Sequence, residues 1–76
     1  MRYVYDLPDL DTPIPPMKAI QAITYEGVEP DVYDDLAAEM RFALDAAKSI
    51  WCPAGSRERL RVYAEKCARL LQERAS

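Results

Sequence analysis

The sequence predicts a small all-α domain with two helices in an antiparallel hairpin, a shorter helix and an extended N-terminal arm. Apolar residues recur at helical spacing over residues 31–51 and again over residues 57–74. The five residues between them, 52–56, read Cys-Pro-Ala-Gly-Ser, which is a turn by composition. Because a short connection makes neighbouring helices antiparallel, these observations together predict the hairpin.

The 76-residue chain is expected to form one domain, with an arm over residues 1–15 and a helical core over residues 16–76. A domain of this size buries only roughly 60% of the surface that its unfolded chain exposes. Its own core is therefore small, and a partner or a second copy of the chain would add burial.

The arm is predicted from its prolines. Residues 2–5 have the composition of a strand but are too few to form a sheet. Residues 7–16 contain four prolines, and each proline disfavours the helical conformation in the residue before it. We expect this segment to run extended across a surface, with Leu7, Leu10 and Ile14 as its anchors.

A short helix is predicted over residues 16–25. Proline is well tolerated in a first helical turn, Met17, Ile20 and Ile23 are spaced as one helical face, and Gly27 is placed to end the helix. The β-branched residues in this segment leave a strand as the alternative.

The longest continuous helical pattern is residues 31–51. Asp31 follows Pro30 and is predicted to cap this helix, and Pro53 is predicted to stop it. The expected core face includes both aromatic residues near its ends and comprises Tyr33, Leu36, Ala37, Met40, Ala43, Leu44, Ala47, Ile50 and Trp51. The expected solvent face comprises Asp34, Asp35, Glu39, Arg41, Asp45 and Lys48.

A second apolar row on this helix does not belong to the core face. Ala38, Phe42 and Ala46 follow one another at a spacing of four, on the side away from Met40 and Leu44. The helix is therefore predicted to be apolar on two sides, which is more than its companions can cover.

The last helix is predicted over residues 57–74, with Ser56 as its N-cap. Its apolar face is expected to pack on the preceding helix and comprises Leu60, Tyr63, Ala64, Cys67, Leu70 and Leu71.

Charge is distributed unevenly along the chain. The net charge of −3 argues against general attraction to nucleic acid or to anionic membranes. Acids exceed bases by three in residues 1–30 and again in residues 31–50, whereas bases exceed acids by three in residues 51–76. Such a polarised chain favours attraction between its own helices and steering of a protein partner.

The cysteines and the hydropathy pattern predict a cytoplasmic protein that does not enter a membrane. Cys52 and Cys67 are expected to stand about 16 Å apart along the hairpin, too far for a disulfide. Unpaired thiols are typical of a reducing compartment. No apolar leader follows Arg2, and no run approaches the roughly 18 apolar residues of a membrane span.

The sequence offers little for catalysis. It has no histidine and no glycine-rich loop, and two cysteines without histidine cannot complete a tetrahedral zinc site. We therefore expect no enzymatic activity, no metal and no cofactor.

The favoured hypothesis is a non-enzymatic regulator or inhibitor that occupies the surface of another protein. The expected binding surface combines the second apolar row with nearby acids and the arm, and comprises Asp35, Ala38, Glu39, Phe42, Asp45, Ala46, Tyr3 and Tyr5. In size, charge and helical character the chain is similar to phage- and plasmid-encoded inhibitors of host machines, anti-CRISPR proteins included.

Two alternatives remain open at this stage. A small helix-turn-helix regulator would bind DNA through the basic last helix, using Arg57, Arg59, Arg61 and Arg69. A self-associating module would bring the Phe42 row of two copies together in a two-fold homodimer.

Overall fold

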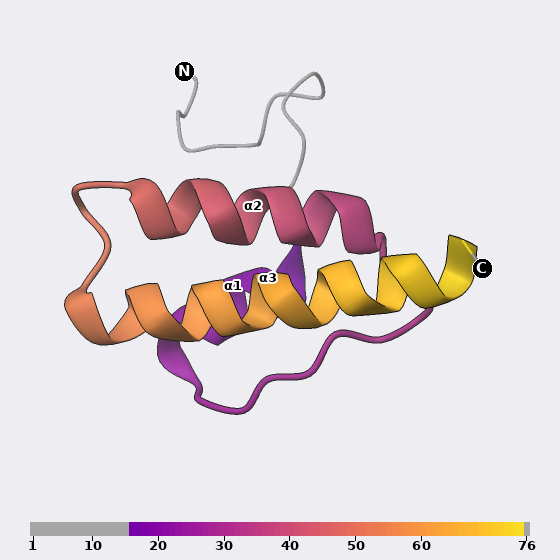
Figure 1. Cartoon of the computed structure of the whole chain (residues 1–76). Helices are drawn as coiled ribbons and strands as arrows, with labels where there is room; N and C mark the ends of the chain where they lie inside the picture. The colour runs from indigo at the N-terminus through magenta and orange to yellow at the C-terminus, as the bar shows by residue number, and fades with distance from the viewer. Residues whose placement is uncertain (1–15, 76) are drawn as a thin grey trace, which may run out of the picture.

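Three helices form the described part of the protein. The computed structural model describes residues 16–75, and within them lie α1 (Met17–Thr24), α2 (Leu36–Lys48) and α3 (Ala54–Ala75) (Figure 1). No strand occurs in this range. The all-α fold class is therefore confirmed, while the predicted arm of residues 1–15 lies outside the described residues.

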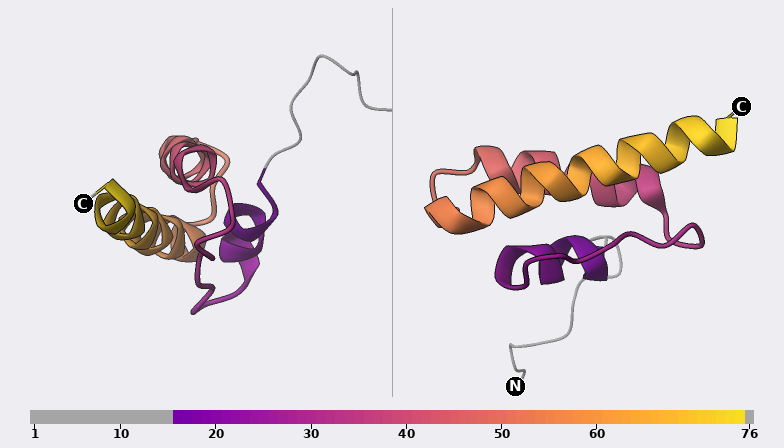
Figure 2. Two further views of the ribbon diagram at one scale, coloured as in Figure 1. Left: turned by 90° about the vertical axis from the view of Figure 1, so that its right-hand side faces the viewer. Right: turned by 60° about the horizontal axis from the view of Figure 1, so that its bottom comes forward.

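α2 and α3 run antiparallel and form the predicted hairpin, joined by the short connection at one end of the molecule (Figure 1). α1 packs against both of them from one side, as the end-on view in Figure 2 shows. The connection from α1 to α2 then returns along the hairpin to its opposite end (Figures 1 and 2).

α1 is a helix, so the alternative of a strand is wrong. Each of its ends lies within one residue of the predicted bound. Its last turn ends at Tyr25, whose backbone N–H donates to the carbonyl of Gln21 at 2.7 Å. Gly27 has a φ of 80°, a left-handed conformation that favours glycine. This turn sends the chain away from the helix, as the sequence predicts.

α2 is shorter than predicted at both ends. Asp35, and not Asp31, is its N-cap, and accepts a hydrogen bond from the backbone N–H of Ala38 at 3.2 Å. Asp31 instead accepts from the N–H of Tyr33 at 2.9 Å, and Ser49 Oγ accepts from the N–H of Trp51 at 3.1 Å. At the C-terminal end, Ser49 takes the Trp51 donor that a longer helix would need. At the N-terminal end, Asp31 closes a separate turn, in which the N–H of Asp34 donates to its carbonyl at 3.0 Å, and the helix begins only after Asp35.

α3 begins three residues earlier than predicted, because the carbonyl of Pro53 accepts from the N–H groups of Ser56 and Arg57. The prediction that Ser56 caps this helix is wrong. Ser56 is buried inside the first turns, and its hydroxyl donates to the carbonyl of Ile23 at the end of α1. Arg59 Nη1 donates to the same carbonyl at 3.2 Å, so α3 side chains satisfy the end of α1.

The core lies between the three helices and contains many small side chains. Its largest fully buried members are Tyr63, Leu36, Leu60 and Cys67, and Ala19, Ala22, Ala43, Ala47 and Ala64 complete it. Alanine at the contact points lets helix backbones approach one another closely but buries little apolar area. The predicted apolar face of α3 is confirmed, since all six of its members are buried or half-buried.

The predicted core face of α2 is confirmed only in its middle. Leu36, Ala43 and Ala47 are buried and Met40 is half-buried. Ala37 and Leu44 are exposed, and so are Tyr33, Ile50 and Trp51, which lie outside the helix. Placing those five residues in the core was wrong.

Candidate functional site

Large apolar side chains are exposed at both ends of α2. Tyr33 is 93% exposed, and Ile50 and Trp51 are each 85% exposed. We call Val32 and Tyr33 the Tyr33 turn, and Ile50 and Trp51 the Trp51 turn. Each turn is fixed by the side-chain to backbone hydrogen bond described above. The two turns are therefore the best candidates for contact with another molecule.

Two basic residues lie near the Trp51 turn. Lys48 ends α2 just before it, and Arg57 lies in the first turns of α3, with Nη2 donating to the carbonyl of Ser49 at 3.4 Å. Neither cation forms an ion pair with any residue in the range 16–75. An indole ring, an aliphatic side chain and two available positive charges thus share one end of the hairpin.

Acidic residues lie on both sides of the Tyr33 turn. Asp31, Asp34 and Asp35 flank it, and Asp34 Oδ2 accepts from the N–H of Asp31 at 3.0 Å. Asp34 also lies 3.8 Å from the ammonium of Lys18, whereas Asp31 and Asp35 have no ion pair among the described residues. This end therefore combines an exposed phenol with two available negative charges.

The predicted apolar row of α2 is partly exposed. Ala38 and the neighbouring acids Asp35 and Asp45 are exposed, whereas Phe42 and Ala46 are half-buried and pack against the core. We call these five residues the α2 surface. Tyr3 and Tyr5, predicted to join it, lie outside the described residues.

Glu39 does not lie on the solvent face, contrary to the prediction. It is only 4% exposed, and the hydroxyl of Tyr63 donates to its Oε1. It therefore offers no charge to a partner at this surface. The sequence could have indicated this burial, because helical spacing places Glu39 on the same face as Leu36 and Ala43.

Tyr63 and Cys67 form a buried polar group with Glu39. Burial raises the pKa of the Cys67 thiol to about 11, and the nearby Glu39 carboxylate adds to the shift. Burial also raises the pKa of Tyr63, helped by its hydrogen bond to Glu39. Both groups stay protonated near neutral pH, so neither is a nucleophile there.

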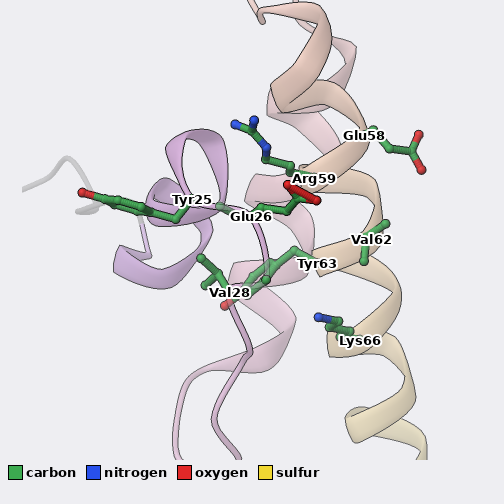
Figure 3. Close-up of a pocket in the computed structure, with 10 residues that line it drawn as sticks. Tyr25, Glu26, Val28, Glu58, Arg59, Val62, Tyr63 and Lys66 are labelled. Carbon is green, nitrogen blue, oxygen red and sulfur yellow. The ribbon is translucent and has the colours of Figure 1, made fainter.

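A hollow of about 280 Å³ lies between the end of α1 and α3 (Figure 3). Its apolar wall includes Ala22, Val28 and Val62. Arg59 and Lys66 point toward the α1 side, whereas Glu58 points away (Figure 3). Both cations are already engaged within the chain, Arg59 with the Ile23 carbonyl and Lys66 with the carboxylate of Glu29. The charge of Lys66 is therefore neutralised, whereas Arg59 has no carboxylate partner among residues 16–75 but is half-buried and held by a backbone carbonyl.

The four arginines predicted for DNA binding do not share one face. At about 100° per residue, Arg57 and Arg61 lie on one side of α3 and Arg59 lies roughly opposite Arg57. Arg61 also lies 3.9 Å from Glu58, and Arg59 is half-buried against α1. Arg69 is exposed farther along the helix.

No group of three or more candidate side chains could hold a metal ion within residues 16–75. None of the described helices combines the length and the hydropathy that crossing a bilayer requires. Cys52 and Cys67 are both free thiols, half-buried and buried respectively.

Comparison of the chain with known protein families, with characterised proteins and with solved structures gave no match.

Proposed function

We propose that this protein is a non-enzymatic regulator that acts by occupying the surface of another protein. The observation that supports this proposal is the 85% exposure of both Ile50 and Trp51. The hydroxyl of Ser49 accepts a hydrogen bond from the backbone N–H of Trp51, so the turn that exposes this pair has a defined conformation. A free chain gains nothing from holding these side chains in water, whereas a complex would bury them.

Tryptophan is the residue type best suited to such a contact. An aromatic side chain buries roughly 150–250 Å² in an interface and loses few rotatable bonds. Tryptophan is also enriched among the few interface residues that dominate binding energy. Trp51 is therefore the proposed anchor.

The docking surface extends from the Trp51 turn onto the α2 surface. Asp35, Ala38 and Asp45 are exposed there, with Phe42 and Ala46 partly accessible beneath them. The matching partner would present an apolar pocket for the indole and polar groups for the acids along α2. We place this activity in the cytoplasm, and inhibition of a host machine by a phage- or plasmid-encoded protein is the form that size and charge favour.

Affinity capture from extracts of the native cell tests the proposal. The tagged chain should recover a partner, and Trp51→Ala should lose it, because the anchor is gone while the fold remains. Val62→Ala is the matched control, since Val62 is a 39% exposed apolar residue of α3 away from this surface. Equal recovery by the Trp51 variant would refute the proposed anchor.

Phe42→Asp is a poorer probe of the same surface. Phe42 packs against the core, so a charge there would weaken folding as well as binding. Asp45→Lys is preferable, because Asp45 is exposed and forms no ion pair among residues 16–75. Its expected effect is weaker capture with unchanged helicity.

A further inference from the structure

The two turns at the ends of α2 are complementary to each other. The Tyr33 turn places an exposed phenol and a valine beside the available acids Asp31 and Asp35. The Trp51 turn places an exposed indole and an isoleucine beside available cations. Each end thus has an aromatic ring, an aliphatic side chain and two charges, and the charges are of opposite sign.

The two turns cannot meet within one chain. They are separated by the 13 residues of α2, which span about 20 Å at 1.5 Å per residue. Figure 1 shows them at opposite ends of the hairpin, the Trp51 turn beside the start of α3 and the Tyr33 turn toward its end. Contact between them therefore needs two molecules.

We infer that the occupant of the Trp51 turn, when no other partner is present, is the Tyr33 turn of a second copy of this chain. The rings and aliphatic side chains would pack together, while Asp31 and Asp35 of one copy would neutralise Lys48 and Arg57 of the other. Opposite charges favour this arrangement, whereas two identical ends brought together would repel.

The contact is heterologous, because different surfaces of the two copies meet. Of two molecules in contact, one keeps its Tyr33 turn unused and the other keeps its Trp51 turn unused, so growth continues beyond a dimer unless a ring closes. Two aromatic residues and two aliphatic ones make a small interface, well below the roughly 1,200 Å² of stable complexes. Association should therefore be weak, rise with protein concentration and weaken with salt.

Self-association of this kind would regulate the proposed function, because it covers the same Trp51 that anchors the partner. It does not depend on that function. Sedimentation of the purified chain needs no foreign protein, so a monomeric chain would remove this inference and leave partner capture to its own test.

The experiment is sedimentation velocity of the full chain over a wide range of concentrations. The average mass of the wild type should rise beyond that of a dimer. Tyr33→Ala and Trp51→Ala should each sediment as monomers alone, because each lacks one of the two complementary ends. Leu44→Ala, at an exposed apolar site in the middle of α2, should associate like the wild type.

Mixing the two variants is the decisive step. An equimolar mixture of Tyr33→Ala and Trp51→Ala has one intact end of each kind, so it should give a complex of twice the monomer mass and no larger. A two-fold dimer in which both pairs form at once would give the same result in the mixture, but its wild type would stop at twice the monomer mass. A variant that associates alone, a mixture that stays monomeric, or a wild type that stays at the monomer or dimer mass overturns the inference.

Discussion

Glu39 is the residue whose surroundings differ most from what its type predicts. Its carboxylate is buried between α2 and α3, where the hydroxyl of Tyr63 donates to it. A buried polar group without a partner costs free energy, whereas a hydrogen-bonded one is tolerated. This pair therefore fixes how the two long helices face each other.

Removing one partner of this pair should destabilise the protein. Tyr63→Phe leaves the buried Glu39 carboxylate without its donor, at an expected cost of about 1–3 kcal/mol in the free energy of unfolding. The double variant Glu39→Met with Tyr63→Phe should recover most of this loss, because no unsatisfied group remains. Urea unfolding followed by circular dichroism measures both. A single variant as stable as the wild type would show that the hydrogen bond is not formed.

Stability should also fall in alkaline solution. The ordinary pKa of a cysteine thiol is 9.0, and burial raises the pKa of Cys67 in the folded chain to about 11. Between these values the unfolded chain releases the proton while the folded chain holds it, so the free energy of unfolding decreases as pH rises from about 9 to about 11. Tyr63 adds a loss of the same sign above pH 10.

Cys67→Ala separates these two contributions. Its unfolding midpoint in urea should fall less steeply than that of the wild type between pH 9 and pH 10, whatever its stability at neutral pH. Identical slopes for both proteins would mean that the Cys67 thiol is not protected by burial.

At the level of elements, the sequence predicted that three helices form and which face of α3 is buried, but it did not predict where α2 begins and ends. Leu60, Tyr63 and Cys67 lie on the predicted face of α3, because an apolar stripe leaves one way to pack. The same periodicity continued through Tyr33 and Trp51 without a break. Asp31 and Ser49 accept local hydrogen bonds from the N–H groups of Tyr33 and Trp51, which lie in turns outside the helix. An apolar periodicity does not show such hydrogen bonds.

The two aspartates before α2 provide a matched test of this explanation. Asp35→Ala removes the N-cap and should cost about 1 kcal/mol in the free energy of unfolding. Asp31→Ala removes a hydrogen bond in an exposed turn outside the helix, so its cost should be clearly smaller. Thermal unfolding of the two variants makes the comparison, and a larger loss from Asp31 would place the helix start where the sequence predicts it.

The candidate site was only partly predictable for a related reason. The row of Ala38, Phe42 and Ala46 was expected to be free, but Phe42 and Ala46 pack against the core and only Ala38 is exposed. Tyr33 and Trp51 were assigned to the core, and they are the exposed side chains. Which apolar residues remain uncovered depends on where a helix begins and ends, and an error of five residues at the start of α2 and three at its end placed surface residues in the core.

At the level of the whole molecule, an apolar core rich in alanine holds the three helices together and leaves two aromatic turns uncovered. The turns differ in charge, with acids around Tyr33 and cations around Trp51. This polarity follows the sequence, in which acids dominate the first 50 residues and bases the remainder. The proposed anchor and the proposed self-association both depend on Trp51 being free in the isolated chain.

Quenching of tryptophan fluorescence in dilute protein tests that claim most directly, because Trp51 is the only tryptophan. We predict emission at the wavelength of an indole in water and full access to acrylamide. Iodide should quench more strongly than caesium, since Lys48 and Arg57 attract an anion. Emission shifted to shorter wavelength and protection from acrylamide at high dilution would show that the isolated chain covers Trp51 itself, and would contradict the account.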